Sequence, residues 1–450
     1  MSNRFFQFSM MLLGLALVSQ AGYAQFSVSA QLRTRGELRD GQGAPLSKGA
    51  KPAAFISQRS RLNFSFNSVR IKTGFSVQDV RVWGQDVSTI NRNTVQELNG
   101  LMLHEAWADI LLTDSNARAA AISLKIGRQE LIYDDQRLLG NLDWLQQARR
   151  HDAGVLKFER KRWRVHAGAA FNQNKENQSG TVYSSITPAN YASSTNGGMM
   201  YKSMQFLYAA RALSNGSASF LFFADQFSRF DTETIDNVST KTFTKGSWPR
   251  YTTGFYYLDR FGKFQLNASA YYQFGKSQLG EATRAYMLTF NGTRDLGRFS
   301  AGAGLDLTSG TAGSGVNKSF DPLYGTPHKF WGAMDYFYAG SPFGNGGLAD
   351  YFIRLKFKKS KTVHFAADLH HFSSASRKEG NPSTVRRLGE EIDLLVNYSL
   401  TPEIGFEAGY SHFFSSALLT SAAVKNVPNS RNSANWAYVM INIKPQFSFK

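Results

Sequence analysis

Polar and apolar residues alternate along most of the chain. The even positions of residues 59–67 become apolar while the odd ones stay polar, and the odd positions of residues 163–171 are apolar. Residues 351–358 and 391–398 show the same alternation. Successive side chains of a strand point to opposite faces, so this period of two predicts half-buried β-strands.

Short turns separate many of these runs. Eight tight turns pair sixteen strands into eight hairpins, and further strands near residues 26–38 and 434–449 bring the prediction to about eighteen. The nine remaining connections are longer and rich in Gly, Asn, Ser and Pro, the longest spanning 309–346. The turns are expected near 67–68, 113–116, 160–161, 214–216, 259–262, 292–297, 359–361 and 401–402.

An even strand count, alternating short and long connections, and both termini on the short-turn side are typical of an outer-membrane β-barrel. The fold class is therefore predicted as all-β: a transmembrane antiparallel barrel with short periplasmic turns and long extracellular loops. A sandwich or propeller would not place all short turns on one side. No apolar run long enough for a membrane helix follows Gln25. Phe447 and Phe449 give the last strand an aromatic end, and Pro445 is expected to interrupt it.

The first 24 residues read as a secretory signal. Arg4 supplies a positive start, Phe5–Val18 is apolar apart from two polar residues, and small residues at 22 and 24 suit cleavage before Gln25. A membrane anchor is the alternative, but the stretch is short and lacks a stop-transfer flank. The mature protein is then one domain, residues 25–450, in the outer membrane of a Gram-negative cell.

The composition narrows the chemistry. The 450 residues include no Cys, which excludes disulfides and thiolate sites, and 51 Lys+Arg against 33 Asp+Glu give a net charge of +18. An exported barrel rarely meets nucleic acid. His364, Asp368 and His370 share a strand face but lie too far apart to hold one ion without other strands. His370 and Ser373 could suggest a hydrolase, but the sequence around them shows no nucleophile motif. We expect no cofactor, no metal and no enzyme activity.

A barrel of this width leaves an aqueous lumen, whose selectivity depends on inward charges. Acids are expected there too, at Glu37, Glu391, Asp393 and Glu407. The cations could pair with acids across strands or meet lipid at the rims. Arginines at i and i+2 without interleaved acid, in the first two strands, favour a lumen that attracts anions. The alternation places toward the lumen Arg33, Arg35, Arg59, Arg61, Lys72, Lys125, Lys157, Arg211, Arg354, Lys356 and Arg387.

The connection 131–150 is unusually dense in charge, amide and aromatic residues for a solvated loop. It contains Asp134, Asp135, Arg137 and Trp144. We expect this segment to fold into the pore and narrow it.

Several motifs resemble the alginate export family of outer-membrane barrels, and the Gln25 start and aromatic strands resemble its Bacteroidetes members. The motifs are Gly127-Arg128-Gln129-Glu130, Asp134-Asp135-Gln136-Arg137, Asp143-Trp144, His328–Gly332 with Met334–Tyr336, Leu32–Arg35 and Ser57–Arg61.

The resemblance implies an eighteen-stranded barrel whose electropositive constriction passes a polyuronate. Arg128 lies at an even position of its strand, like the lipid-facing Ile122, Leu124 and Ile126. Its side chain therefore reaches the pore only if a bulge intervenes or the strand has already ended. Asp134 and Asp135 would keep an anionic polymer from binding too tightly, and Trp107 and Trp144 could stack on sugars. The arginines implied to line the track are Arg33, Arg59, Arg61, Arg128, Arg137 and Arg149.

The sequence thus predicts a passive channel that exports an alginate-like polyuronate. A porin that takes up acidic oligosaccharides or small anions is the alternative, and a structural or adhesive barrel is a third hypothesis. The expected partners are an anionic polysaccharide or oligosaccharide, outer-membrane lipid and lipopolysaccharide, and periplasmic export components.

Overall fold

The chain forms strands with very little helix. No helix among the described residues is long and apolar enough to cross a membrane. The computed structural model describes residues 25–84, 101–114, 120–172, 201–235, 238–311, 315–341, 343–376 and 386–449. The two short helices are η1 (Pro327–Lys329) and α2 (Ala417–Thr420). The strands are β1 (Gln25–Asp40), β2 (Ala53–Asn67), β3 (Ile71–Val82), β4 (Met102–Leu111), β5 (Ala121–Gln129), β6 (His151–Arg160), β7 (Trp163–Phe171), β8 (Ser203–Ala212), β9 (Ser217–Ile235), β10 (Val238–Phe261), β11 (Phe264–Lys276), β12 (Ala282–Leu296), β13 (Phe299–Thr308), β14 (Leu348–Lys358), β15 (Val363–Ser373), β16 (Arg387–Ser399), β17 (Ile404–Ser415), β18 (Ser433–Ile443) and β19 (Gln446–Phe449).

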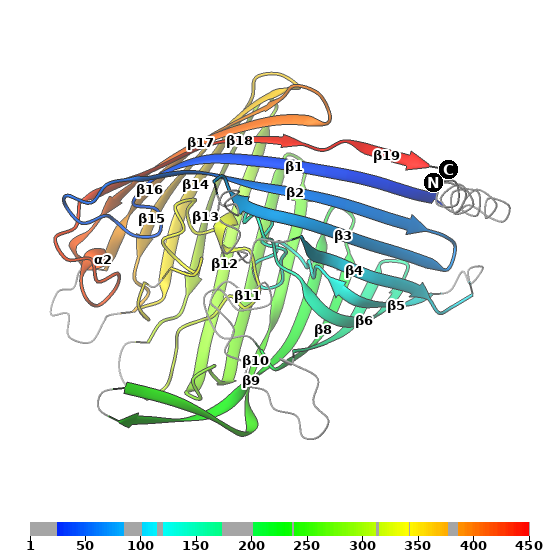
Figure 1. Ribbon diagram of the computed structural model, residues 1–450, viewed down its shortest axis with the longest axis horizontal. Coiled ribbons are helices and arrows are strands. Elements are labelled where there is room, and N and C mark those ends of the chain that lie inside the picture. The colour runs from blue at the N-terminus through cyan, green and yellow to red at the C-terminus, as the bar shows by residue number, and fades with distance from the viewer. Residues whose placement is uncertain are drawn as a thin grey trace, which may run out of the picture.

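The strands close into an antiparallel barrel of eighteen. Each strand from β1 to β18 pairs with its neighbour in sequence, and β1 also pairs with β18 and β19. β18 and β19 are two parts of one barrel strand, interrupted at Pro445 as expected, and the amide of Ala30 donates to the Pro445 carbonyl across the break. Figure 1 shows β1 between β2 and this last strand, so the predicted fold class is confirmed.

The short turns lie where the alternation predicts them. Seven of the eight join the expected strand pairs, and the turn at 113–116 falls partly outside the described residues. Two of the nine long connections are shorter than predicted. Residues 277–281 alone link β11 to β12, and β9 and β10 continue their pairing as far as Ile235 and Val238. These two strands project beyond the others as a twisted ribbon (Figure 1).

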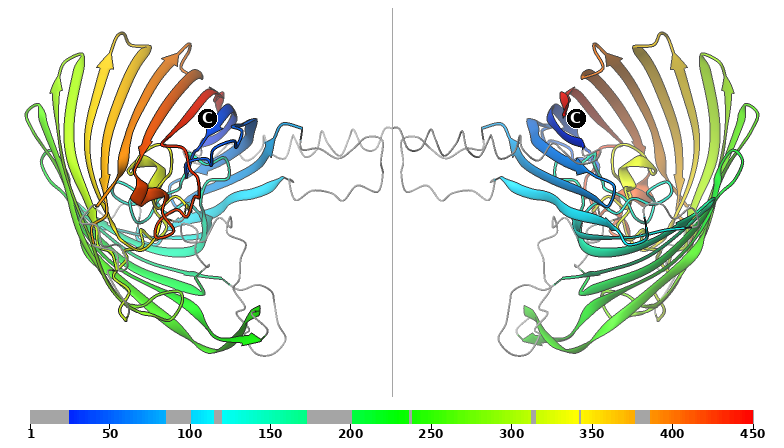
Figure 2. Two further views of the ribbon diagram at one scale, coloured as in Figure 1. Left: turned by 90° about the vertical axis from the view of Figure 1, so that its left-hand side faces the viewer. Right: turned by 90° about the vertical axis from the view of Figure 1, so that its right-hand side faces the viewer.

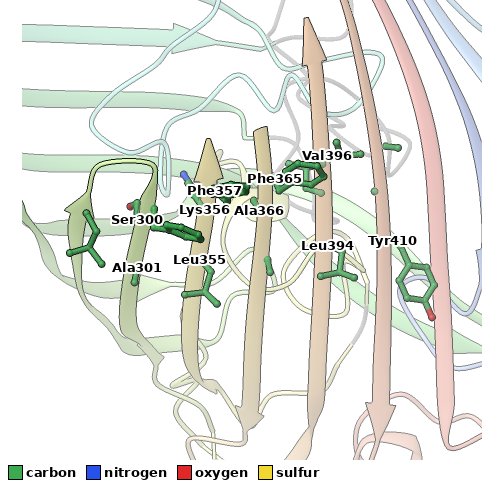
Figure 3. Close-up of a pocket in the computed structure, with 16 residues that line it drawn as sticks. Ser300, Ala301, Leu355, Lys356, Phe357, Phe365, Ala366, Leu394, Val396 and Tyr410 are labelled. Atoms are coloured by element: carbon green, nitrogen blue, oxygen red, sulfur yellow. The ribbon is translucent and has the colours of Figure 1, made fainter. Parts of the chain in front are cut away.

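The outer face of the barrel is apolar. Leu355, Leu394 and Tyr410 are exposed there, and Figure 3 shows them on strands of the same face. They belong to the lining of an almost wholly apolar groove of about 730 Å³ that crosses β13 to β17. Exposed apolar side chains on every second residue are what a bilayer-facing surface requires. The predicted signal peptide lies outside the described residues.

The largest buried side chains lie inside the barrel rather than between layers. Several of them, including Tyr324, Trp331 and Tyr336, come from the connection 309–347, which we name the plug loop, and the others come mostly from strands. A second connection, residues 130–150, is named the inner loop. Both loops lie within the curve of the strands (Figure 2). A parallel bridge between Leu139 and Tyr324 joins them. Leu139 and Tyr324 are at most 1% exposed, so the prediction that the inner loop folds into the pore is confirmed.

Candidate functional site

Two arginines from adjacent strands hold the inner loop against the wall. Arg33 of β1 and Arg59 of β2 are cross-strand neighbours. Arg33 donates from Nη1 to the Asp143 carbonyl at 2.7 Å and from Nε to Gln146 at 2.9 Å. Arg59 donates from Nη1 to Asp143 Oδ1 at 2.8 Å, and Gln31 accepts from its Nη2 at 2.6 Å. Both guanidinium groups are buried.

Arg35 and Arg61 extend this cluster on either side. Arg35 donates from Nη1 to the Trp144 carbonyl at 2.9 Å, lies over the Trp144 ring at 4.2 Å, and pairs with Glu37. Arg61 lies 3.8 Å from the Asp143 carboxylate and donates to Gln78. All four predicted arginines therefore point into the lumen, and each one contacts or approaches the inner loop.

Asp143 is the counter-ion of this cluster. Burial alone would raise its pKa, but the charges of Arg59, Arg33 and Arg61 outweigh burial and hold the pKa of Asp143 below its usual range. The carboxylate stays ionised at neutral pH. The arginines are thus largely occupied in fixing the loop, which limits what they can offer to a passing anion.

The predicted residues of the inner loop itself also make structural contacts. Arg137 pairs with Asp135 at 2.9 Å and with Asp306 of β13 at 2.5 Å, and it packs on the Phe330 ring at 3.9 Å. Asp134 accepts hydrogen bonds from Tyr208 and Ser219 on the wall.

Burial raises the pKa of Asp134, because the charged form loses solvation. Arg149 is buried and donates to the Gly325 carbonyl of the plug loop. The inner loop is therefore fixed to the plug loop as well as to the barrel wall.

Arg354 lies on the opposite wall beside open space. Its Nε is 3.2 Å from Asp368, and both are half-buried. They line a cavity of about 250 Å³ beneath the two loops, bounded by strands β14 to β18 and lined by aromatic and acidic side chains. A second space of about 680 Å³ separates the plug loop from β10 to β12.

Three predicted lumen residues, Arg128, Arg211 and Arg387, do not face the lumen. Arg211 lies on the outward side of β8 with the exposed Leu207, and its guanidinium packs over the exposed Trp163 ring at 5.5 Å.

Arg128 shares the outward parity of Ile122, Leu124 and Ile126 and pairs with Asp152 at 2.8 Å, although Gly127 before it has φ +122°. The distortion at Gly127 does not turn the next side chain inward.

Arg387 is also misplaced by the sequence prediction. It pairs with Glu390, which is bonded in turn to the exposed His371 on the outward parity of β15. Arg387 is the first residue of β16, and a register shift beside it, between Phe372 and Ser373, breaks the simple alternation.

Sequence reasoning missed other lumen residues. Lys358 follows Lys356 on the inward parity of β14, and neither side chain makes an ion pair with any described residue. Trp436 and Tyr438 contact Trp144, at ring-centroid distances of 5.8 and 5.1 Å. The alternation of β18 would have placed both aromatics inward.

The His364, Asp368 and His370 set does not come together, since His370 bonds to Asp350 instead. Within the described chain, a different group, His104, Glu105 and Glu130, brings its ligand atoms within 4.8 Å of one another. His104 Nε2 is 2.9 Å from Glu130 Oε1. Arg61 and Lys125 lie near enough to interact with both carboxylates and already balance their charge.

The model of the alginate export family matches residues 24–431, nearly the whole chain. The chain belongs to the alginate export family. No curated protein matches it significantly. The family and the barrel support an outer-membrane channel and suggest transport rather than catalysis.

Solved barrels resemble it in fold. OccAB4 of Acinetobacter baumannii is 12% identical with a TM-score of 0.59, covering 95% of this chain and 99% of that one. OccK3 (OpdO) of Pseudomonas aeruginosa is 12% identical with a TM-score of 0.58, covering 94% and 96%. OpdK of the same organism, solved with vanillate, is 10% identical with a TM-score of 0.57, covering 94% and 99%. At 10–12% identity, the likeness of these three barrels to this chain is one of fold.

Proposed function

We propose that this protein is a passive outer-membrane channel for an anionic polysaccharide, with export of an alginate-like polyuronate as its function. The observation that carries the proposal is a pair of inward cations, Lys356 and Lys358, at the turn end of β14, which form no ion pair with any residue that the structure describes. Short turns and termini of such barrels face the periplasm. An exported polymer would meet these lysines first.

Membership of the alginate export family supports the same substrate class. A polyuronate carries one carboxylate on each sugar, so several weak cationic sites in series would lower the cost of threading it and still release it. Arg354 continues the row of inward cations from Lys356 toward the loops. The lipid and lipopolysaccharide around the barrel, and periplasmic export components at its turn end, are the partners that this role requires.

The test is single-channel conductance in a planar bilayer under a salt gradient, with and without oligouronates. The proposal expects anion selectivity and block by oligouronates. The double variant Lys356→Ala/Lys358→Ala should weaken the block about twofold to thirtyfold, since each exposed ion pair contributes about 0.2–1 kcal/mol. Arg294→Ala is the matched control, because Arg294 lies at the same end of the barrel but faces outward beside Phe264.

The second candidate is a porin for small anions. The likeness in fold to OpdK solved with vanillate favours considering it. Anion selectivity without oligouronate block would support this porin and contradict polymer export. Cation selectivity, or no conductance at all, would contradict both.

A further inference from the structure

A pair of tyrosines marks one edge of the apolar band on the outward face of β11 and β12 (Figure 1). Tyr272 and Tyr286 lie directly opposite each other, and both are exposed. Toward the short turns, the exposed Leu288 and Phe290 continue this face of β12. Aromatic girdles flank the apolar band of an outer-membrane barrel at the lipid headgroups. Side chains beyond the tyrosines, on the side away from the turns, therefore lie at headgroup level.

The spacing of two arginines on β12 supports this placement. Arg284 and Arg294 are both exposed and share the outward parity, ten residues apart. Ten residues of strand span about 34 Å, which at a tilt of about 40° corresponds to a height of about 26 Å. The apolar band of such a barrel is about 25 Å tall. The two arginines therefore lie at opposite surfaces of the membrane, with Arg294 at the turn end and Arg284 at the extracellular end.

Three cations gather at the extracellular end of these strands. Lys276 pairs with Ala282, two residues before Arg284, so the Cα atoms of Lys276 and Arg284 are about 7–8 Å apart. The Arg284 amide donates to the Asn317 carbonyl, which brings the exposed Lys318 to the edge of β12. None of the three cationic side chains forms an ion pair or hydrogen bond with any residue that the structure describes.

One acid lies close to this group in sequence. Glu281 accepts hydrogen bonds from Ser277 at 3.2 Å and from Asn317 at 2.8 Å. Asn317 forms a bridge with Thr283, whose side chain is buried on the inward parity. Glu281 is thus held toward the inward side of β12. Even when its charge is counted against the three cations, the group keeps an excess of two positive charges.

Two other outward arginines at the extracellular end are already neutralised. Arg128 pairs with Asp152, and Arg387 pairs with Glu390. In addition, only residues 277–281 connect β11 to β12, so the connection above the cationic group is short. The group on β11 and β12 therefore combines free positive charge with access from the lipid side.

We propose that Lys276, Arg284 and Lys318 bind the phosphate groups of lipopolysaccharide in the outer leaflet, with the tyrosine pair against the lipid below them. Lipopolysaccharide forms the extracellular leaflet of a Gram-negative outer membrane and carries phosphates on its lipid anchor. Guanidinium and ammonium groups both recognise phosphate, and basic clusters at headgroup level bind anionic lipid headgroups. The inference rests on the orientation of the barrel in the membrane and is independent of polyuronate passage.

The test is native mass spectrometry of the detergent-solubilised barrel with deep-rough lipopolysaccharide as the probe. The wild type should retain the lipid, and it should bind the same lipid more weakly after the phosphates have been removed. The triple variant Lys276→Gln/Arg284→Gln/Lys318→Gln should lower the affinity about eightfold, as expected if three exposed charge pairs contribute roughly twofold each.

The matched control is the triple variant Lys263→Gln/Arg294→Gln/Arg298→Gln. These three exposed cations lie at the turn end of the same strands, so the control loses the same charge at the opposite membrane surface. Its affinity for lipopolysaccharide should match the wild type. Heat-modifiable migration on gels checks that each variant is folded, and the comparison of the two lipids on the wild type needs no variant.

Three outcomes would overturn the inference: unchanged affinity in the extracellular triple variant, an equal loss in the turn-end control, or equal binding of the dephosphorylated lipid to the wild type. A matching loss of phosphatidylglycerol binding in the extracellular variant would indicate a general patch for anionic lipid and overturn the assignment to lipopolysaccharide. Oligouronate block of the channel is measured separately, so a failure of this site leaves the proposed function standing, and the reverse also holds.

Discussion

Replacing Asp143 with Asn should release the inner loop from the barrel wall. The substitution keeps the side chain's shape but removes the charge that Arg59 meets at 2.8 Å and Arg33 at 3.3 Å. Breaking a fully buried ion pair costs about 3–5 kcal/mol, because the remaining charge is left unpaired. The Asp143 side chain is 42% exposed, however, so solvent screens part of that cost.

A cost of about 2 kcal/mol is therefore expected, which corresponds to a roughly 30-fold larger population of the undocked loop. The barrel itself should remain folded, because the backbone pairing of β1 with β2 and β18 does not involve Asp143. The undocked loop no longer narrows the lumen. In single-channel recordings, the time that the channel spends in a high-conductance state should therefore rise about 30-fold.

Asp79→Asn provides the control for this experiment. Asp79 pairs with Arg81 at 2.6 Å on the outward parity of β3, so it loses the same charge without contacting the inner loop. Its recordings should match wild type. If Asp143→Asn forms a folded barrel on gels and still gates like the wild type, the arginine cluster does not hold the inner loop.

Two further predictions concern the plug loop. Burial lowers the pKa of Lys425 to about 7, and its Nζ donates to the Tyr336 carbonyl. An undocked lysine stays protonated up to about pH 10. Docking of residues 416–432 should therefore strengthen as pH rises from 7 toward 10 and be weakest below pH 7. Hydrogen exchange should show this trend beyond the intrinsic rate change, and Lys425→Met should flatten it. The second prediction concerns Gly332, which has a φ of +83° and where an added Cβ would lie 2.4 Å from the Glu391 carboxylate. Gly332→Ala should therefore weaken docking of the plug loop by about 1–3 kcal/mol and raise hydrogen exchange at residues 327–340. Unchanged exchange at these residues would contradict the packing argument.

The fold could be predicted almost completely from the sequence because a strand's period of two is local. Alternation at residues 59–67 or 351–358 determines which side chains face outward without any knowledge of the neighbouring strand. Prediction was wrong where local geometry departs from the simple ladder. The ribbon of β9 and β10 runs past the barrel because its pairing simply continues, and composition gave no signal for its end.

The candidate site was predicted less well, because parity gives the direction of a side chain but not its partner. Arg33 and Arg59 face inward as expected. The arginine clustering that suggested an anion site is neutralised, however, by Asp143, which comes from a loop more than eighty residues away in sequence. Arg387 failed for a smaller reason. The alternation of side chains is least regular at the first residue of a strand, and the register shift beside Arg387 breaks the alternation at that position.

Counting inward arginines therefore overstates the charge available to a substrate in this barrel. A guanidinium that makes three or more hydrogen bonds to the inner loop has little left to offer, because binding an anion would first require breaking those contacts. Lys356 and Lys358 carry no such cost, since no described acid pairs with them. If the channel attracts polyanions, its selectivity should follow these two lysines, and the arginines should govern the width of the lumen instead. The Asp143 and lysine variants separate these roles: the first should alter conductance, the second should alter block.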